Sequence, residues 1–279
     1  MKFSILTLFP EMFEGLLSSS ILARAQRQEL IEIERVQIRD FAIDRHNTVD
    51  DYSFGGGPGM VMKADVLERA LSSVYKNSLG SKEQVSKSVH VVYLSPQGVK
   101  FSQDTARRFA RLDHLILICG HYEGIDERFV ETFVDEELSI GDFVLTGGEI
   151  PAMAVVDGVA RLRPGVIGDA QSFRDDSFYG SLLDHPHYTR PAKWTPDFSC
   201  LDSRQRSVDK GAEVVVEPPA ALLSGDHMAV VDWRRRQSLL RTLIRRPDLL
   251  DGAGLTKVEK RLLDKLAKGL AEDLGRAVF

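Results

Sequence analysis

The chain has 279 residues, of which 43% are hydrophobic and 28% are charged, and these ordinary globular values allow a sizeable core in about two domains. No segment approaches the roughly 20 apolar residues that a membrane-spanning helix requires, and the apolar run at 3–9 ends at Pro10, so neither a membrane span nor a signal peptide is expected. The two cysteines, Cys119 and Cys200, give no disulfide framework and no metal-ligand spacing. The composition predicts a soluble, cytoplasmic protein.

The net charge of −5 hides an uneven distribution along the chain. Residues 185–279 contain 17 Lys and Arg against 13 Asp and Glu, whereas the whole chain contains 36 against 41. A basic C-terminal part beside an acidic body favours a polyanionic partner. An ordinary solvated helical surface is the alternative explanation.

Apolar periodicity alternates between strand and helix over the first part of the chain, to about residue 160. Strands are predicted at 3–9, 30–41, 90–96, 114–120 and 143–148. Helices are predicted at 11–29, 63–77, 102–113, 125–136 and 149–162. Ser102 is the expected N-cap of the third helix. This alternation predicts an α/β domain with a mostly parallel sheet.

The second part of the chain is irregular before it becomes helical. Residues 77–88 and 195–211 are interpreted as insertions, and 164–191 as a linker without periodicity. Helices are predicted at 227–246 and 256–274, the latter opening with Thr256 and Glu259 at the spacing of a capping box. The apolar face expected on the first of these helices contains Leu239, Leu240, Leu243 and Ile244.

Three glycine-containing turns lie at the ends of predicted strands: YLSPQG at 93–98, CGHYEGID at 119–126 and SIGDFVLTGGEIP at 139–151. In open α/β sheets ligands bind outside the carboxyl ends of the strands, and glycine lets the backbone approach them closely. We therefore expect the three turns to form one binding site. Simple turn closure is the alternative for each glycine taken alone.

The chemistry of these turns narrows the class of ligand. No GxGxxG follows the first strand, and FGGGPGM at 54–60 lacks the Lys and Ser or Thr of a phosphate loop. Pro58 also removes a backbone donor from that segment, so a surface loop is expected there. A neutral pocket lined by backbone favours an adenine-bearing thioether or sulfonium cofactor over a nucleoside triphosphate.

A set of motifs occurs in a fixed order along nearly the whole chain: YLSPQG, GHYEGIDER, SIGDFVLTGGEIPAM, RLRPGVIG, DDSF, LLDHPHYTRP and RRRQSLLRTLIRRPDLL. Together they resemble the TrmD family of bacterial tRNA (guanine-N1)-methyltransferases, of the SPOUT class. The resemblance implies an α/β domain at 1–167 with a deep trefoil knot. It also implies an interdomain linker at 168–190 and a small helical, tRNA-binding C-terminal domain at 191–279.

The resemblance further implies that S-adenosylmethionine binds within the knot in a bent shape. The implied cofactor residues are Tyr93, Leu94, Ser95, Pro96, Gly98, Gly120, Tyr122, Glu123, Gly124, Ile140, Gly141, Asp142, Phe143, Val144, Leu145, Gly147, Gly148 and Pro151. A homodimer with active sites at the subunit interface is implied, as is a Mg²⁺ requirement, for which Glu123 and Asp176 are acidic candidates. His121 departs from the family pattern, which commonly has Arg at this position.

The implied reaction is methylation of N1 of guanine 37 in tRNAs with a preceding guanine, which supports reading-frame maintenance. N1 of guanine carries a proton at neutral pH, so a carboxylate must remove it. The implied catalytic residues are Asp176, as that base, and Arg161, against the nucleotide's phosphate or base. Asp175 is the neighbouring alternative for the base.

Several polar residues are implied to contact the anticodon arm of tRNA. They are Ser172, His187, Arg190, Arg234, Arg241 and Arg245. His185 and His187 form an H-x-H pair, but the sequence offers no further ligand and no metal site is predicted. The alternatives are a non-catalytic RNA-binding factor with this fold, a SPOUT enzyme acting on another RNA or on a ribose 2′-hydroxyl, and, more distantly, a dehydrogenase.

Overall fold

The computed structural model describes residues 1–78, 88–168, 176–197 and 215–277. The chain divides into two compact units, Met1–Ala170 and Gln171–Phe279, and each is described by itself. The predicted insertions at 77–88 and 195–211 fall largely outside the described residues. No helix in the described ranges is both long and apolar enough to cross a membrane.

The first unit is built on a five-stranded sheet with the strand order β2-β1-β6-β5-β7. Its strands are β1 Lys2–Thr7, β2 Glu32–Gln37, β5 Val89–Lys100, β6 His114–Cys119 and β7 Glu136–Ser139. Every neighbouring pair in this sheet is parallel. The predicted α/β architecture with a mainly parallel sheet is therefore confirmed.

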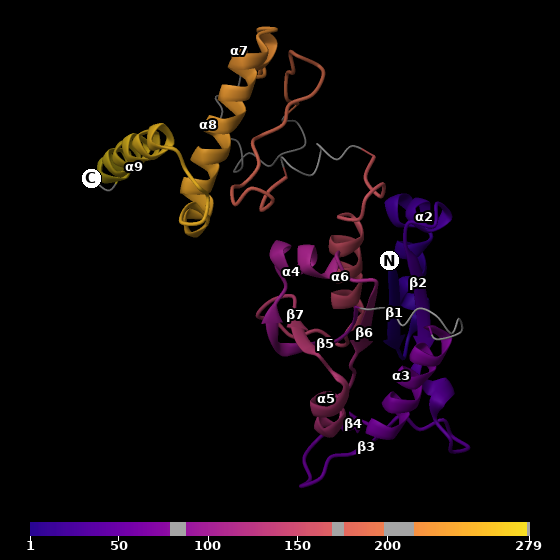
Figure 1. The fold of residues 1–279 in the computed structure, drawn as a ribbon. Coiled ribbons are helices and arrows are strands. Elements are labelled where there is room, and N and C mark those ends of the chain that lie inside the picture. The colour runs from indigo at the N-terminus through magenta and orange to yellow at the C-terminus, as the bar shows by residue number, and fades with distance from the viewer. Residues whose placement is uncertain (79–87, 169–175, 198–214, 278–279) are drawn as a thin grey trace. The chain divides into compact units, whose positions relative to one another are not determined.

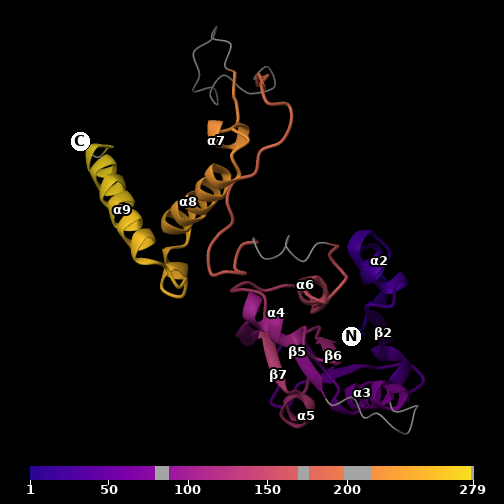
Figure 2. The ribbon, with the colours of Figure 1, turned by 45° about the horizontal axis from the view of Figure 1, so that its top comes forward.

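Helices cover both faces of this sheet, as Figures 1 and 2 show from two directions. One face is covered by α1 Glu14–Leu17, α2 Ser20–Arg27, α4 Gln103–Phe109 and α6 Glu149–Ala160, and the other by α3 Ala64–Ser78 and α5 Glu127–Phe133. The central strand β6 is buried along its whole length. Leu115 packs into the core on one face and Ile116 into the core on the other. A strand covered on both faces explains its continuous apolar run.

Three predicted elements differ from the structure. The strand expected at 30–41 ends at Gln37, and the 3-10 helix η2 Ile38–Phe41 follows it. The helix expected at 11–29 is split into η1 Pro10–Phe13, α1 and α2, with Ser20 in the left-handed region at a φ of 53°. No strand forms at 143–148, and the last strand is β7, which the sequence assigned in part to a helix. Phe143 and Val144 are 55% and 83% exposed. These two apolar side chains are therefore not part of the hydrophobic core.

Strand β5 also runs further than predicted, past Pro96 to Lys100. Leu138 of β7 pairs first with Leu94 and then with Val99, so the residues between them form a bulge. A bulge accommodates Pro96, which has no N–H to donate to the ladder. Gly98 lies within it, and a Cβ there would come within 2.3 Å of the β7 backbone, so no larger residue fits.

A short hairpin that the sequence did not predict joins β3 Asp50–Tyr52 to β4 Met60–Met62. Its connection contains the FGGGPG segment, in which four glycines have positive φ values. The hairpin is tied to the second glycine turn, because Glu123 N donates to Met60 O at 3.0 Å and Met62 N donates to Gly124 O at 3.0 Å. The loop expected at 54–60 thus lies beside a turn expected to bind a ligand.

The described residues of the second unit form α7 Ala220–Leu223, α8 His227–Arg245, η3 Pro247–Leu250 and α9 Lys257–Ala277. Its core is small and centres on Leu182, Leu239 and Leu263. Leu240 and Leu243 are half-buried, but Ile244 is 55% exposed, so the predicted apolar face of α8 is only partly covered within this unit. The buried Thr242 hydroxyl accepts a hydrogen bond from Leu183 N at 2.9 Å.

The predicted helix signals are confirmed at atomic detail. Ser102 caps α4 by accepting from Thr105 N at 3.3 Å. Thr256 and Glu259 form the capping box, in which Glu259 accepts from Thr256 N at 2.8 Å and donates its own N–H to the Thr256 hydroxyl at 3.2 Å. Arg235 of α8 also donates to Glu259 at 2.6 Å. Burial raises the pKa of Glu259, but hydrogen bonds from Arg235 and Thr256 outweigh it and lower the pKa to about 2.

We expect Glu259→Gln to destabilise the second unit by about 1 to 2 kcal/mol, because a charged hydrogen-bond acceptor is lost. The folded pKa is lower than the unfolded one, so the stabilisation is fully present above the ordinary pKa of 4.5 and is lost as the pH falls towards about 2. Chemical denaturation followed by tryptophan fluorescence at several pH values measures this effect. The matched control is Asp232→Asn, which removes an exposed ion pair with Arg236 and should cost about 0.5 kcal/mol or less.

Candidate functional site

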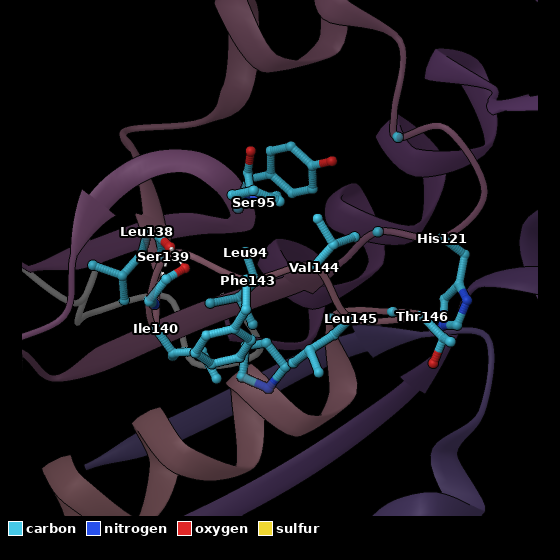
Figure 3. Close-up of a pocket in the computed structure, with 18 of the residues that line it drawn as sticks. Leu94, Ser95, His121, Leu138, Ser139, Ile140, Phe143, Val144, Leu145 and Thr146 are labelled. Carbon is cyan, nitrogen blue, oxygen red and sulfur yellow. Dashed lines mark hydrogen bonds between the residues drawn. The ribbon is translucent and has the colours of Figure 1, made fainter.

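A pocket of about 250 Å³ lies at the bulge of β5 and the carboxyl ends of β6 and β7, where the three glycine-containing segments meet (Figure 3). The first of these segments, predicted as a turn at 93–98, lies within β5. It is lined by Tyr93, Leu94, Ser95, Pro96, Gly120, His121, Tyr122, Glu123, Gly124, Leu138, Ser139, Ile140, Gly141, Phe143, Val144, Leu145, Thr146, Gly147, Gly148 and Pro151. The sequence expectation that these turns form one site agrees with this geometry.

The lining contains all of the residues expected to bind the cofactor except two, Gly98 and Asp142. Gly98 packs against the β7 backbone inside the bulge. The Asp142 side chain is 79% exposed and is paired with Lys100. Gly98 therefore allows the close approach of β5 to β7, and the Asp142 side chain lies outside the pocket wall.

Four lining residues were not among the expected cofactor residues: His121, Leu138, Ser139 and Thr146. His121 and Thr146 lie inside the segments 119–126 and 139–151, so including every residue of those segments would have found them. Ser139 ends β7 and holds the next turn, since its hydroxyl donates to Gly141 O at 3.0 Å.

The glycines of the site bring the turns into backbone contact. Gly148 N donates to Gly120 O at 3.0 Å, which joins the turn after β6 to the start of α6. A Cβ on Gly148 would lie 2.6 Å from the Cα of Cys119, and one on Gly147 would lie 2.3 Å from Cε1 of His121. Side chains at these two positions would force the turns apart.

The residues around the pocket are largely uncharged. Burial, together with the nearby Glu137 carboxylate, raises the pKa of Tyr93 to about 12, so its phenol is neutral at physiological pH. Burial and the neighbouring Glu149 raise the pKa of the Cys119 thiol, which is fully buried in the core beside the pocket. Glu123 is the exposed carboxylate of the lining. Such walls suit an apolar and aromatic ligand that is held by backbone groups.

One polar network adjoins the pocket. His121 Nε2 lies 2.7 Å from Glu149 Oε2, and the Thr7 hydroxyl donates to Glu149 Oε1 at 2.6 Å. The Glu149 side chain is only 1% exposed. It lies in the first turn of α6, where the helix N-terminus favours a negative charge.

The two residues expected to carry catalysis belong to different units. Arg161 is half-buried at the C-terminal end of α6, in the first unit, and its N–H donates to Asp157 O at 3.2 Å. Asp176 is half-buried in the second unit, where its backbone carbonyl accepts from Tyr179 N at 3.2 Å. Each is placed within its own unit. The nearby Arg163 is anchored in the first unit by donating to Ala110 O at 2.7 Å.

The residues expected to contact RNA lie in the second unit. Ser172 falls outside the described residues. Four of the others are exposed and Arg241 is half-buried; the exposed ones are His187, Arg190, Arg234 and Arg245.

The structure adds Asp184 to the H-x-H pair. Its carboxylate lies 2.8 Å from Nδ1 of His185 and 2.8 Å from Nε2 of His187. These three groups lie within 4.8 Å of one another and could together offer metal ligands, a possibility that the sequence spacing did not reveal. Hydrogen bonds to both rings already account for the arrangement.

Comparison with known proteins gives a consistent result. The family model described as tRNA (guanine-1)-methyltransferase TrmD matches residues 1–200. A tRNA (guanine-N(1)-)-methyltransferase of Magnetococcus marinus is 56% identical over 97% of this chain and 97% of its own. A relative with the same name from Pelotomaculum thermopropionicum is 49% identical over 98% of this chain and 98% of its own. Another from Staphylococcus carnosus is 44% identical over 97% of this chain and 99% of its own. The chain therefore belongs to the tRNA (guanine-1)-methyltransferase TrmD family.

Proposed function

We propose that the protein transfers a methyl group from S-adenosylmethionine to N1 of guanine 37 in tRNAs in which a guanine precedes it. The observation that carries this proposal is the neutral pocket between three glycine turns, in a chain that belongs to a family of tRNA (guanine-N1)-methyltransferases. Methylation beside the anticodon would support maintenance of the reading frame. An enzyme that acts on tRNA is expected in the cytoplasm.

The pocket fits S-adenosylmethionine in its chemistry. The unsubstituted backbone of Gly120 and Gly147 lets the edge of an adenine approach for hydrogen bonding, while Leu145 and Pro151 offer apolar contacts. In our proposal the strands and turns around this pocket form the deep trefoil knot of the SPOUT class. When bound, S-adenosylmethionine supplies an electrophilic methyl group on a sulfonium.

Two side chains act on the guanine in this proposal. The Asp176 carboxylate accepts the proton from N1, so that the freed electron pair of N1 can take the methyl group. Arg161 holds the target nucleotide through its planar guanidinium, which suits a phosphate or a base edge. Positioning of both groups relative to the methyl donor is the main source of the rate enhancement.

The remaining parts of the proposal concern the partners. Exposed Arg234 and Arg245, half-buried Arg241, and His187 with Arg190 bind the anticodon arm, as does Ser172 outside the described residues. The enzyme is a homodimer with active sites at the subunit interface. Exposed apolar side chains of the first unit, such as the 95% exposed Phe54, favour such a partner. Glu123 offers Mg²⁺ one exposed carboxylate at the pocket, which fits an ion that keeps several waters.

Methyl transfer from labelled S-adenosylmethionine to tRNA transcripts tests the reaction and the base together. We expect transfer to a transcript with guanine at position 37 and none to one with adenine there. Asp176→Asn should lower the rate at least about 100-fold, because the proton acceptor is lost, while cofactor binding persists. Asp175→Asn is the matched control and should stay close to the wild-type rate. Loss of activity in Asp175→Asn but not in Asp176→Asn would identify Asp175 as the base. Transfer to neither tRNA would contradict the proposed reaction.

The RNA surface predicts a defined salt dependence. Arg234→Ala and Arg245→Ala should each weaken tRNA binding and reduce the slope of log K against log salt by about 0.7 to 0.9 for each phosphate that the protein no longer neutralises. Filter binding or anisotropy at several salt concentrations measures this slope, with S-adenosylmethionine affinity unchanged. Arg107→Ala on α4 removes the same charge from the first unit and should leave the slope as it is. Equal slopes for all four proteins would contradict the assignment.

A further inference from the structure

A second cavity lies on the other side of one pocket wall. It has a volume of about 280 Å³ and is lined by Phe9, Met12, His121, Thr146, Gly147, Glu149 and Ile150. Three of these residues also line the first pocket, namely His121, Thr146 and Gly147. Figure 3 shows His121 next to Thr146 at one end of the first pocket. These three residues therefore form a thin wall with a hollow on each side.

A chain of hydrogen bonds braces this wall. His121 Nε2 lies 2.7 Å from Glu149 Oε2, Glu149 Oε1 accepts from the Thr7 hydroxyl at 2.6 Å, and that hydroxyl accepts from Phe9 N at 2.9 Å. The chain joins the end of β1, the first turn of α6 and the turn after β6. These segments are far apart in sequence, so the brace exists only in the folded state.

The carboxylate in this chain of hydrogen bonds is buried and depends on its partners. A carboxylate taken out of water is stable only when its oxygens are hydrogen-bonded. The Glu149 side chain is 1% exposed, and each of its oxygens has one donor among the hydrogen bonds of the described residues. Without the imidazole, Glu149 Oε2 would be buried and unpaired, so the carboxylate would have to move towards water.

The position of the wall also depends on how His121 and Glu149 pack against it. A Cβ on Gly147 would lie 2.3 Å from Cε1 of His121 and 2.6 Å from Oε2 of Glu149, so both side chains lie against the Gly147 backbone. The Phe9 ring meets the imidazole edge-on, with a centroid distance of 4.9 Å. The imidazole of His121 is thus packed between Phe9 and Gly147. A movement of this ring would therefore displace the Gly147 backbone.

We propose that His121 and Glu149 are positioning residues for the methyl donor, because the bond between them fixes the wall of Thr146 and Gly147 and so sets the affinity for S-adenosylmethionine. Without this bond the wall relaxes into the second cavity and the first pocket loses its shape. The inference rests on the proposed function. It gives His121 a role in this chain: the imidazole supports the pocket through Glu149.

Titration calorimetry on the full chain tests the proposal, with S-adenosylmethionine and S-adenosylhomocysteine as probes. His121→Ala should raise the Kd of both ligands about tenfold, equivalent to the loss of one good hydrogen bond. His121→Gln, whose amide donates at a reach similar to Nε2, should restore the Kd to within about threefold of wild type. Glu149→Ala should weaken binding, and adding His121→Ala to it should change little, because the two residues act as one unit.

A matched control separates positioning from general stability. His114 begins the same strand, β6, at the end away from the pocket, is 3% exposed, and lies 2.9 Å from the Ser4 hydroxyl. His114→Ala should lower the melting temperature at least as much as His121→Ala and leave both Kd values unchanged. In methyl-transfer assays His121→Ala should raise KM for S-adenosylmethionine while kcat at saturation stays close to wild type.

The outcomes distinguish this inference from the proposed function. Wild-type protein that binds neither probe would contradict the proposed function itself. Wild-type binding with unchanged Kd values in His121→Ala would overturn the positioning role alone. A fall in kcat with an unchanged KM would also overturn it, because His121 would then act on the reacting base. Equal weakening by His114→Ala would show that the effect is one of stability.

Discussion

The backbone contact between Gly120 and Gly148 is the constraint on which the site depends. The hydrogen bond from Gly148 N to Gly120 O, at 3.0 Å, joins the turn after β6 to the N-cap residue of α6. It is possible only because Gly148 has no side chain, since a Cβ there would lie 2.6 Å from the Cα of Cys119. The same contact places Glu149 next to His121. Pocket shape and polar network therefore follow from one close approach.

The architecture explains why the pocket lies at this edge of the sheet. The strand β6 is buried along its whole length, with the cores under α4 and α6 on one face and under α3 and α5 on the other. Nothing on the faces of such a sheet is open to a ligand. The turns at the carboxyl ends of the strands are still accessible to a ligand. Because neighbouring strands are parallel, these turns lie at the same edge of the sheet. The turns after β6 and β7 consequently meet beside the bulge of β5.

Sequence patterns predicted most of the fold because periodicity reports burial, as in the fully buried strand at 114–119. The pattern failed where apolar residues line a pocket instead of a core, as Phe143 and Val144 do, and at β7, whose four residues are too few to show alternation. Glycine turns and ordered motifs indicated most of the pocket, since those signals are local. The contact of Thr7 with Glu149 spans 142 positions, and neither residue stands out from its neighbours in the sequence, so only the folded structure reveals it.

The proposed methyl donor places a further demand on the residues around it. A sulfonium methyl group is electrophilic, so a strong nucleophile such as a thiolate or a phenolate near it must be kept protonated. Burial keeps the Tyr93 phenol and the Cys119 thiol protonated, by raising the pKa of each. The base proposed to free the nucleophile, Asp176, belongs to the second unit rather than to the pocket. Donor and base therefore come from separate parts of the chain, and the tRNA supplies the nucleophile. In this proposal the methyl group is held without reacting until the tRNA brings all three together.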